Sequence, residues 1–528
     1  MCGICLVIFY GGGDVCRSDI PKLNFDCLKK RGPDSWLEKS IHNSAYCLHF
    51  FGSVLQMQGN LTKQPLEDNL GNILLWNGEI FGGINIEKGE NDSKKLLDIL
   101  SKAITNDEIL HIFSMIKGPW SFLYWQDVDY TEVASLGLYC LSVNSSNKPK
   151  LFPWSHINEE RLFAEDSLYE KNKHFCDIQT EKLIPPFDKF NFDLPTELDD
   201  INLKQCAKRD ISTIDDLTSI ISEDYWTMSN SLLQKLSDSV RIRISNHQNL
   251  CGNCIKENNR NCEHAKIAVL FSGGIDSLII AALCHSHLVE NEAIDLINVA
   301  FSADNSYSVP DRLTGLKSFK QLQKMYPNRK FNFITVDVSL SDLREARQST
   351  IANLIKPLRT VLDDSIACAI WFAANGIGCV GEKLYKSSAR VILTGMGSDE
   401  QLAGYSRHRM NNGNWDNLAK EVDMDIRRIS ARNLGRDDRI ITDHGKEARF
   451  PFLDEGVVSF LNSLPIWKKT NLYQEKGIGD KLLLRLAAIQ LGLQECSLFV
   501  KRAIQFGSRI AKLESRNEKA SDICERLN

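Results

Sequence analysis

The run Ala268-Val269-Leu270-Phe271-Ser272-Gly273-Gly274-Ile275-Asp276-Ser277 decides how the second half of this chain folds. An apolar strand pattern over residues 266–271 leads into a glycine turn, and a helical pattern over residues 275–287 follows. Glycines at such a junction let backbone N–H groups approach a phosphate, and the helix N-terminus adds positive potential. The run therefore predicts a phosphate-binding loop. The alternative is a serine-capped helix after an ordinary turn.

A second run with the same chemistry is Thr394-Gly395-Met396-Gly397-Ser398-Asp399-Glu400, which ends an apolar strand pattern. Parallel α/β sheets bind ligands at the carboxyl ends of their strands, so the two turns are expected to converge on one nucleotide. Asp276 and Asp399 are then a candidate pair of Mg²⁺ ligands. The alternative is two unrelated turns at the solvent surface.

Prolines and acidic residues near positions 180–205 indicate a linker. Before the linker, short apolar runs alternate with Gly, Asn and Asp, which is typical of β-rich structure. These runs cover residues 5–10, 73–76 and 120–125. We therefore expect one domain at residues 1–190 and a second at residues 205–528.

Strand and helix patterns alternate after the linker. The strand patterns beyond the phosphate loop cover residues 296–301, 331–338 and 389–394, and further helical patterns cover residues 224–246 and 364–375. Such alternation predicts a parallel sheet wrapped by helices. The charged end, residues 512–528, is expected to form a solvated tail or a surface helix.

Composition places the chain among ordinary globular proteins. Of its 528 residues, 43% are hydrophobic and 25% are charged, which excludes a largely disordered or fibrous chain. The formal net charge of −5 gives no general attraction to nucleic acid or membrane phosphates. No apolar run reaches the ~18–20 residues that span a bilayer. No signal-peptide pattern opens the chain, so the 16 cysteines are expected to be reduced thiols of a cytoplasmic protein.

Cys2 stands directly after the initiator methionine. Removal of Met1 leaves a free α-amino group that can act as the base for the Cys2 thiol. Asn77-Gly78 can present an amide and an N–H to a tetrahedral oxyanion, and Asp92 can pair with a substrate ammonium. These groups together suit glutamine. The alternative for Cys2 alone is an incidental buried cysteine.

Two sets of motifs carry a resemblance to a known family. Cys2-Gly3-Ile4, residues 31–34, Asn77-Gly78-Glu79 and Asp92 resemble a class-II glutamine amidotransferase domain. Residues 272–277 and 395–400 resemble the synthetase domain of glutamine-hydrolysing asparagine synthetases, in a divergent branch of that family. The resemblance implies a four-layer αββα Ntn-hydrolase glutaminase domain. It also implies a following α/β ATP pyrophosphatase domain with a parallel sheet, of the adenine-nucleotide α-hydrolase type.

The resemblance also implies a reaction. Cys2 would release ammonia from glutamine, and ATP would activate aspartate as β-aspartyl-AMP, so that asparagine, AMP, pyrophosphate and glutamate are formed. The implied partners are the small molecules glutamine, aspartate and ATP, with Mg²⁺ as cofactor; no nucleic acid and no membrane are expected, and a homodimer is left open. Implied glutamine contacts are Asn77, Gly78, Glu79 and Asp92. Implied ATP contacts are Leu270, Ser272, Gly273, Gly274, Asp276, Ser277, Val299, Thr394 and Gly395, with Mg²⁺ on Asp276 and Asp399.

Three positions depart from the family pattern. Residues 48–64 hold no arginine to bind the glutamine carboxylate; Met396 replaces a glutamate of the amide-forming step; and Ala503 replaces a lysine. Loss of a preorganised charge or donor typically costs ~10²–10³ in rate. The alternative function is therefore a catalytically impaired pseudo-enzyme of the same fold, acting as a nucleotide-binding or interaction module. A further alternative is an adenylating enzyme with another acceptor, against which the retained Cys2 argues.

One more cluster stands outside these motifs. The spacing Cys251-x₂-Cys254-x₇-Cys262-x-His264 could supply a tetrahedral Zn²⁺ site. The alternative is a cysteine-rich insertion without metal. The sequence leaves both open.

Overall fold

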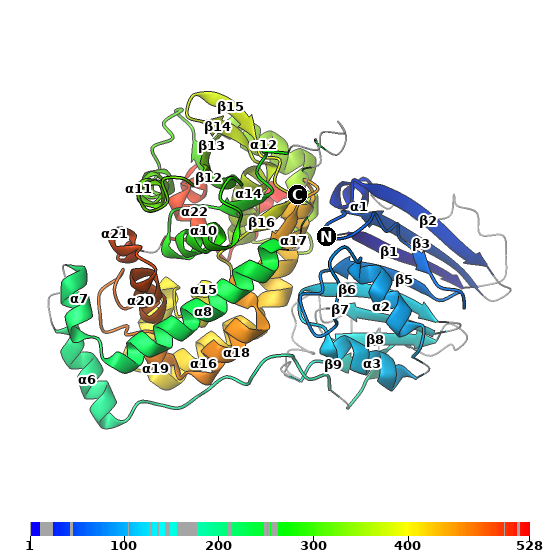
Figure 1. Cartoon of the computed structure of the whole chain (residues 1–528), viewed down its shortest axis with the longest axis horizontal. Coiled ribbons are helices and arrows are strands. Elements are labelled where there is room, and N and C mark those ends of the chain that lie inside the picture. The colour runs from blue at the N-terminus through cyan, green and yellow to red at the C-terminus, as the bar shows by residue number, and fades with distance from the viewer. Residues whose placement is uncertain are drawn as a thin grey trace. The chain divides into compact units, whose positions relative to one another are not determined.

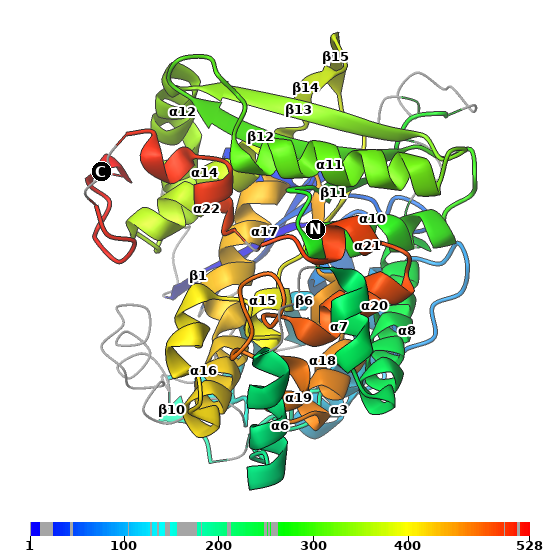
Figure 2. The same cartoon turned by 90° about the vertical axis from the view of Figure 1, so that its left-hand side faces the viewer.

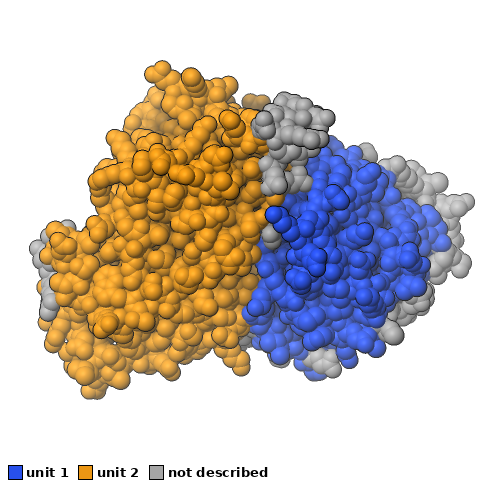
Figure 3. Space-filling model, in the orientation of Figure 1, with its two compact units in different colours: residues 1–186, 442–446 blue, residues 187–441, 447–528 orange. Residues whose placement is uncertain are grey.

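The computed structural model, shown in Figure 1, describes most of the chain. The described residues are 2–10, 25–42, 46–103, 105–126, 129–134, 137–142, 148–155, 177–180, 182–208, 213–245, 247, 251, 254, 262–500, 502–514 and 518–527. The chain forms two compact units, which Figure 3 colours separately. Unit 1 comprises residues 1–186 and 442–446, and unit 2 comprises residues 187–441 and 447–528.

Unit 1 contains two β-sheets. The smaller one is antiparallel in the order β1-β3-β2, with β1 at Gly3–Tyr10, β2 at Ser35–His42 and β3 at Tyr46–Val54. The larger, seven-stranded sheet has the order β10-β9-β8-β7-β6-β5-β4. Its strands are β4 (Leu66–Glu67), β5 (Ile73–Gly78), β6 (Trp120–Gln126), β7 (Asp129–Ala134), β8 (Gly137–Ser142), β9 (Lys150–Pro153) and β10 (Asp177–Ile178). The apolar runs of the first half are thus strands, as predicted.

Successive side chains on a strand point to opposite faces of its sheet, and in unit 1 each face of the larger sheet packs against a different layer. On β3, Leu48 and Phe50 point into a core shared with Leu75 of β5, so the two sheets pack face to face. The opposite face of β5 carries Trp76 into a second core with helices α2 (Asp92–Leu100) and α3 (Asn106–Met115). Helix α1 (Phe25–Arg31) contacts the smaller sheet, where Phe25 packs on Phe51 of β3. The layer order of unit 1 is therefore helix, sheet, sheet, helix.

Unit 2 is built on a sheet of the order β15-β14-β13-β12-β11-β16-β17. Strands β13, β12, β11, β16 and β17 are parallel, and β14 and β15 extend one edge in antiparallel pairing. The strands are β11 (Ile267–Leu270), β12 (Ile294–Ser302), β13 (Phe331–Ser339), β14 (Ile377–Val380), β15 (Lys383–Lys386), β16 (Val391–Leu393) and β17 (Glu447–Arg449). Unit 2 thus has the mixed α/β architecture, with the parallel sheet, that the alternating pattern predicts.

Helices pack on this sheet along its length, as Figure 2 shows. Helix α10 (Ile275–His287) contacts β11 and β12, α11 (Pro310–Met325) contacts β12 and β13, and α14 (Val361–Asn375) contacts all three. The long α8 (Glu223–Ser245) is the helix predicted over residues 224–246 and packs on α10. The other α-helices are α6 (Glu197–Ala207), α7 (Ile214–Ile220), α12 (Leu340–Ala346), α13 (Ala352–Ile355), α15 (Ser398–Gln401), α16 (Trp415–Arg427), α17 (Gly435–Thr442), α18 (Glu455–Ser463), α19 (Ile466–Lys469), α20 (Leu482–Gln490), α21 (Gln494–Ser497) and α22 (Ile504–Gly507).

The charged C-terminal segment corrects part of one prediction. Residues 512–528 are predicted to form a solvated tail or a surface helix, and residues 518–523 are indeed exposed, but Glu514 and Cys524 hold the segment on unit 2. Cys524 is buried, and Glu514 forms an ion pair of 2.7 Å with the buried Arg347. Paired charges let a polar segment join a folded unit, which a composition argument cannot detect. Within the described residues, every helix is too short or too polar to cross a bilayer.

Candidate functional site

The two glycine turns of unit 2 meet where the strand order reverses. From β11 the chain moves to β12 and β13 on one side, and then crosses to β16 on the other side of β11. The carboxyl ends of β11 and β16 therefore flank the crevice in which open α/β sheets bind ligands. The hydroxyl of Ser398, after β16, donates to Oδ1 of Asp276, after β11, at 2.8 Å. The structure thus brings together the turns that the sequence paired.

Glycines allow this close approach. Gly273 has φ +79°, and a Cβ there would lie 2.5 Å from the Cα of Gly315 on α11. A Cβ on Gly395 would lie 2.8 Å from the Cβ of Asp276. Gly274 is the N-cap of α10 and offers no side chain to its first turn. Backbone N–H groups at such a helix start are available to an anion.

A buried lysine lies between the two predicted metal ligands. The Nζ of Lys481 is 2.8 and 2.7 Å from Oδ1 and Oδ2 of Asp276 and 2.6 Å from Oδ1 of Asp399. Lys481 is fully buried and has φ +54°, and Gly404 leaves room for it, because a Cβ there would collide with Lys481 and Asp399. The carboxylates suit Mg²⁺ by their chemistry. Their assignment to Mg²⁺ stays a prediction, because the ammonium has to move before both can hold one ion.

A cavity of about 200 Å³ opens beside these carboxylates. Its walls come from β11, β12, α14, the turn after β16 and the segment before α22. The predicted ATP and metal residues in the lining are Leu270, Ser272, Asp276, Ser277, Val299, Thr394, Gly395 and Asp399. Gly273 and Gly274 are outside the lining and shape the loop behind it. The residues predicted from separate motifs therefore share one cavity.

Glu400 stands in the same lining beside Met396 and is held by neighbours. The Tyr405 hydroxyl donates a short hydrogen bond to Oε1 of Glu400, and Nδ2 of Asn433 donates to the same oxygen at 2.8 Å. Burial and the Glu400 carboxylate raise the pKa of the Tyr405 phenol well above its ordinary value. Asn433 also lies 3.3 Å from Sδ of Met396. The turn thus keeps the Glu400 carboxylate, fixed by its neighbours, but Met396 offers none at the position where the family pattern has a glutamate.

Ala503, which stands where the family pattern has a lysine, also lines this cavity. Ala503 and Arg502 both line it, so the arginine is a candidate cation for this wall. Arg502 is exposed, with Nη1 3.5 Å from Oγ1 of Thr314. Lys501, the other basic neighbour, lies outside the described residues.

Cys2 sits in a small cavity of unit 1, of about 20 Å³. Its thiol lies 3.9 Å from the Gln64 amide, and Arg31 donates to the Cys2 carbonyl at 3.1 Å. Burial raises the pKa of the Cys2 thiol, and the carboxylates of Asp92 and Glu79 raise it further. A thiol in this environment needs a base before it can attack, since the thiolate is the nucleophile.

The predicted glutamine residues mostly gather in this cavity. Gly78, Glu79 and Asp92 line it, whereas Asn77, on the same strand as Gly78, does not. Glu79 accepts from Nε2 of Gln58 at 2.8 Å, and Asp92 accepts from the backbone N–H of Ser93 at 2.7 Å. Among the described residues, the lining contains no lysine or arginine. A glutamine carboxylate would therefore meet no lysine or arginine side chain on these walls, consistent with the arginine missing from residues 48–64.

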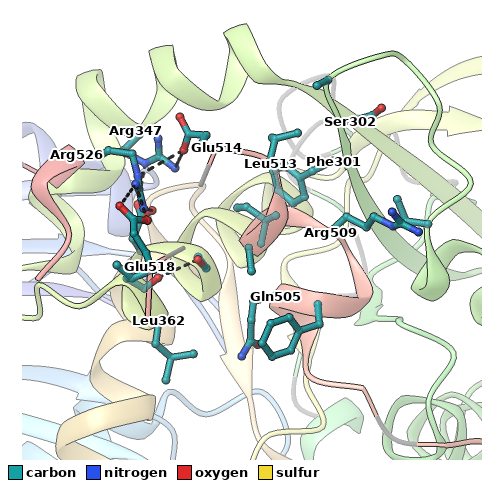
Figure 4. A pocket seen from close by; sticks show the side chains of 18 of the residues that line it. Phe301, Ser302, Arg347, Leu362, Gln505, Arg509, Leu513, Glu514, Glu518 and Arg526 are labelled. Carbon is teal, nitrogen blue, oxygen red and sulfur yellow. Dashed lines mark hydrogen bonds and ion pairs between the residues drawn. The ribbon is translucent and has the colours of Figure 1, made fainter. Parts of the chain in front are cut away.

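A larger cavity of unit 2, about 920 Å³, is shown in Figure 4. Most of the charged side chains that line this cavity form ion pairs with one another. Arg347 pairs with Asp364 at 2.8 Å and with Glu514 at 2.7 Å, and Arg526 pairs with Glu518 at 2.7 Å. This lining contains none of the predicted ATP residues. The predicted ATP residues that line a cavity therefore line the smaller of these two cavities.

Comparison with known proteins identifies the family. A family model described as asparagine synthase matches residues 258–423 and 411–490. The chain is 38% identical to the asparagine synthetase domain-containing protein 1 of Bos taurus and to that of Homo sapiens, over 100% of this chain and 98% of each relative. It is 34% identical to the Drosophila melanogaster asparagine synthetase domain-containing protein CG17486, over 94% of this chain and 95% of that protein. The chain therefore belongs to the family of asparagine synthetase domain-containing protein 1.

Proposed function

We propose that this protein is an ATP-dependent, glutamine-hydrolysing amide-forming enzyme, with aspartate as the default acceptor. The observation that carries the proposal is the meeting of two Gly/Ser/Asp turns at the reversal of strand order, around Lys481. The asparagine synthase family uses ATP. In the proposal, residues 1–190 form the Ntn-type glutaminase domain and residues 205–528 the synthetase domain.

In the proposed reaction, some residues of unit 2 bind phosphate and others stabilise its negative charge. The loop around Gly273 and the start of α10 would hold phosphate through backbone N–H groups. Lys481 would stabilise the negative charge of a departing pyrophosphate, with Asp276 and Asp399 keeping its ammonium in position. Mg²⁺, when bound, would neutralise phosphate charge, and Asp276 and Asp399 would offer it oxygen once the Lys481 ammonium has moved away from them.

In unit 1, Cys2 would attack the glutamine amide after loss of Met1, with its own α-amine as base. Glu79 and Asp92 would face the substrate ammonium. Because the described lining offers no lysine or arginine to the carboxylate, we expect weak glutamine binding and a higher KM for glutamine than for a site with a bidentate arginine.

The second candidate is a nucleotide-binding module that has lost amide formation. Two observations favour it: Met396 and Ala503 both line the cavity, and neither side chain can carry charge or transfer a proton. This candidate predicts nucleotide binding without formation of asparagine.

The test uses the purified full chain with ATP, Mg²⁺, aspartate and either glutamine or ammonia, and follows pyrophosphate and asparagine. The first candidate predicts pyrophosphate release that depends on aspartate. Cys2→Ala should abolish the glutamine-driven product and leave the ammonia-driven product, whereas Cys5→Ala, in the adjoining strand β1, should leave both. Absence of pyrophosphate and of glutamate under every condition would refute the first candidate. ATP binding that persists in that case would support the second.

A further inference from the structure

Three cysteines and one histidine gather in the part of the chain that lies between α8 and β11 in the sequence, and the proposed reaction uses none of them. They are Cys251, Cys254, Cys262 and His264. Their ligand atoms all lie within 4.8 Å of one another. Cys251 and Cys254 are buried, Cys262 is half-buried and His264 is exposed, and the three cysteines are free thiols.

The distances around His264 match a tetrahedral ion. Its Nδ1 lies 3.5 Å from Sγ of Cys251, 3.4 Å from Sγ of Cys254 and 3.9 Å from Sγ of Cys262. Zinc–sulfur bonds of about 2.3 Å and zinc–nitrogen bonds of about 2.0–2.1 Å at a tetrahedral angle would place S and N about 3.6 Å apart. A ring nitrogen has one N–H or one lone pair, so hydrogen bonding accounts for one of these contacts and not for three. A shared cation accounts for all of them.

Backbone donors support the same conclusion. The N–H of Cys251 donates to Sγ of Cys262 at 3.3 Å, and the N–H of Cys254 donates to Sγ of Cys251 at 3.4 Å. Amide donors stabilise negative charge on sulfur, and the thiolate is the form that binds metal. Thiolate and imidazole are the donors that zinc prefers.

We propose that Cys251, Cys254, Cys262 and His264 bind one structural Zn²⁺ ion. Four protein donors fill a tetrahedral shell and leave no open position for water or substrate, which distinguishes a structural site from a catalytic one. Binding releases the protons of the thiols as the zinc–sulfur bonds form. The ion fixes the segment that enters β11, the strand whose other end carries the predicted phosphate loop. This proposal does not depend on the proposed enzymatic function.

The first experiment measures zinc in the full chain, produced without a histidine tag and dialysed against a weak chelator. We expect about one zinc per chain by elemental mass spectrometry. Cys262→Ser and His264→Ala should lower zinc retention by about ten-fold or more. The matched control is Cys206→Ser, which changes another half-buried cysteine of unit 2 and should retain the ion. Circular dichroism checks that each variant is folded.

The second experiment replaces the metal and remains informative if a cysteine variant fails to fold. Cobalt(II) added to the metal-free parent chain should give the visible absorption bands of tetrahedral thiolate coordination, and equimolar zinc should displace them. His264→Ala, which retains all three sulfurs, should shift these bands. The proposal is overturned if the parent chain neither contains zinc nor takes up cobalt, or if zinc retention is equal in the parent chain, Cys262→Ser and His264→Ala.

Discussion

Substitution by methionine at two fully buried lysines should change stability in opposite directions. Lys481 and Lys469 both have no exposed surface in unit 2. The ammonium of Lys481 contacts the carboxylates of Asp276 and Asp399. The ammonium of Lys469 has no hydrogen-bond partner in the described part of the chain and lies 4.4 Å from the ring centroid of Phe190. Methionine has a similar length at both positions, so the comparison isolates the charge.

Removal of one partner of a buried ion pair costs about 3–5 kcal/mol of the free energy of unfolding. The side chains of Asp276 and Asp399 are 15% and 13% exposed, so water relieves part of the loss in Lys481→Met. We therefore expect a loss of about 3 kcal/mol for that variant.

The magnitude for Lys469 follows from its pKa. Burial lowers the pKa of Lys469 from an ordinary value of 10.5 to about 7. At 1.36 kcal/mol per unit, this lowering corresponds to a penalty of about 5 kcal/mol that is fully present below about pH 7. Between about pH 7 and pH 10.5 the unfolded chain binds a proton that the folded chain does not, so stability rises with pH by up to about 1.4 kcal/mol per unit. Lys469→Met removes the penalty and this slope.

The assay is denaturant unfolding of the parent chain and both variants at pH 6, 7.5 and 9, followed by tryptophan fluorescence. We expect Lys469→Met to be more stable than the parent at pH 6, with a difference that shrinks as the pH rises. Lys481→Met should be less stable at every pH. Equal losses in both variants, or a neutral Lys481→Met, would refute the reasoning from buried charge.

Gly273→Ala should weaken nucleotide binding in a thermal-shift titration, because the backbone φ of Gly273 is +79° and α11 leaves no room for a Cβ. The control is Gly71→Ala, where φ is +85° but no atom lies within 4 Å of the added Cβ. This control should carry backbone strain of about 1–2 kcal/mol without changing nucleotide binding. Unchanged nucleotide affinity in Gly273→Ala would contradict the predicted phosphate loop. Burial raises the pKa of Asp480, but Arg485 and a backbone N–H outweigh burial and lower the pKa to about 2. The ionised Asp480 therefore contributes about 2 kcal/mol to the free energy of unfolding above about pH 4, and this contribution is lost as the pH falls toward 2. Asp480→Asn should make the free energy of unfolding less dependent on pH between about pH 4 and pH 2. An acid-unfolding profile equal to that of the parent chain would contradict this role of Asp480.

Local signals identified much of unit 2. Hydrophobic periodicity and turn-forming residues predict three kinds of element there: the helix over residues 275–287, the strand before it and the two glycine turns. Each of these depends on residues that are neighbours in the sequence. The same holds for the spacing of Cys251 and Cys254.

Other features depend on contacts between distant residues. Lys481 lies 205 residues from Asp276, in a segment with no motif of its own, so no pattern predicted that its ammonium lies between two aspartates. The burial of Cys524 and the ion pair between Glu514 and Arg347 are of the same kind, because the sequence of a charged tail does not show which distant residues it contacts.

The amino-acid sequence by itself determined the strands, the loop glycines, the position of Cys2 and the residue types at each departure, because these depend on neighbours along the chain. Only the tertiary structure decided which groups share a cavity, which charges neutralise one another and which four ligand atoms face a common point. The physical reason is that charge, burial and coordination act through space over a few ångströms, whatever the separation in sequence.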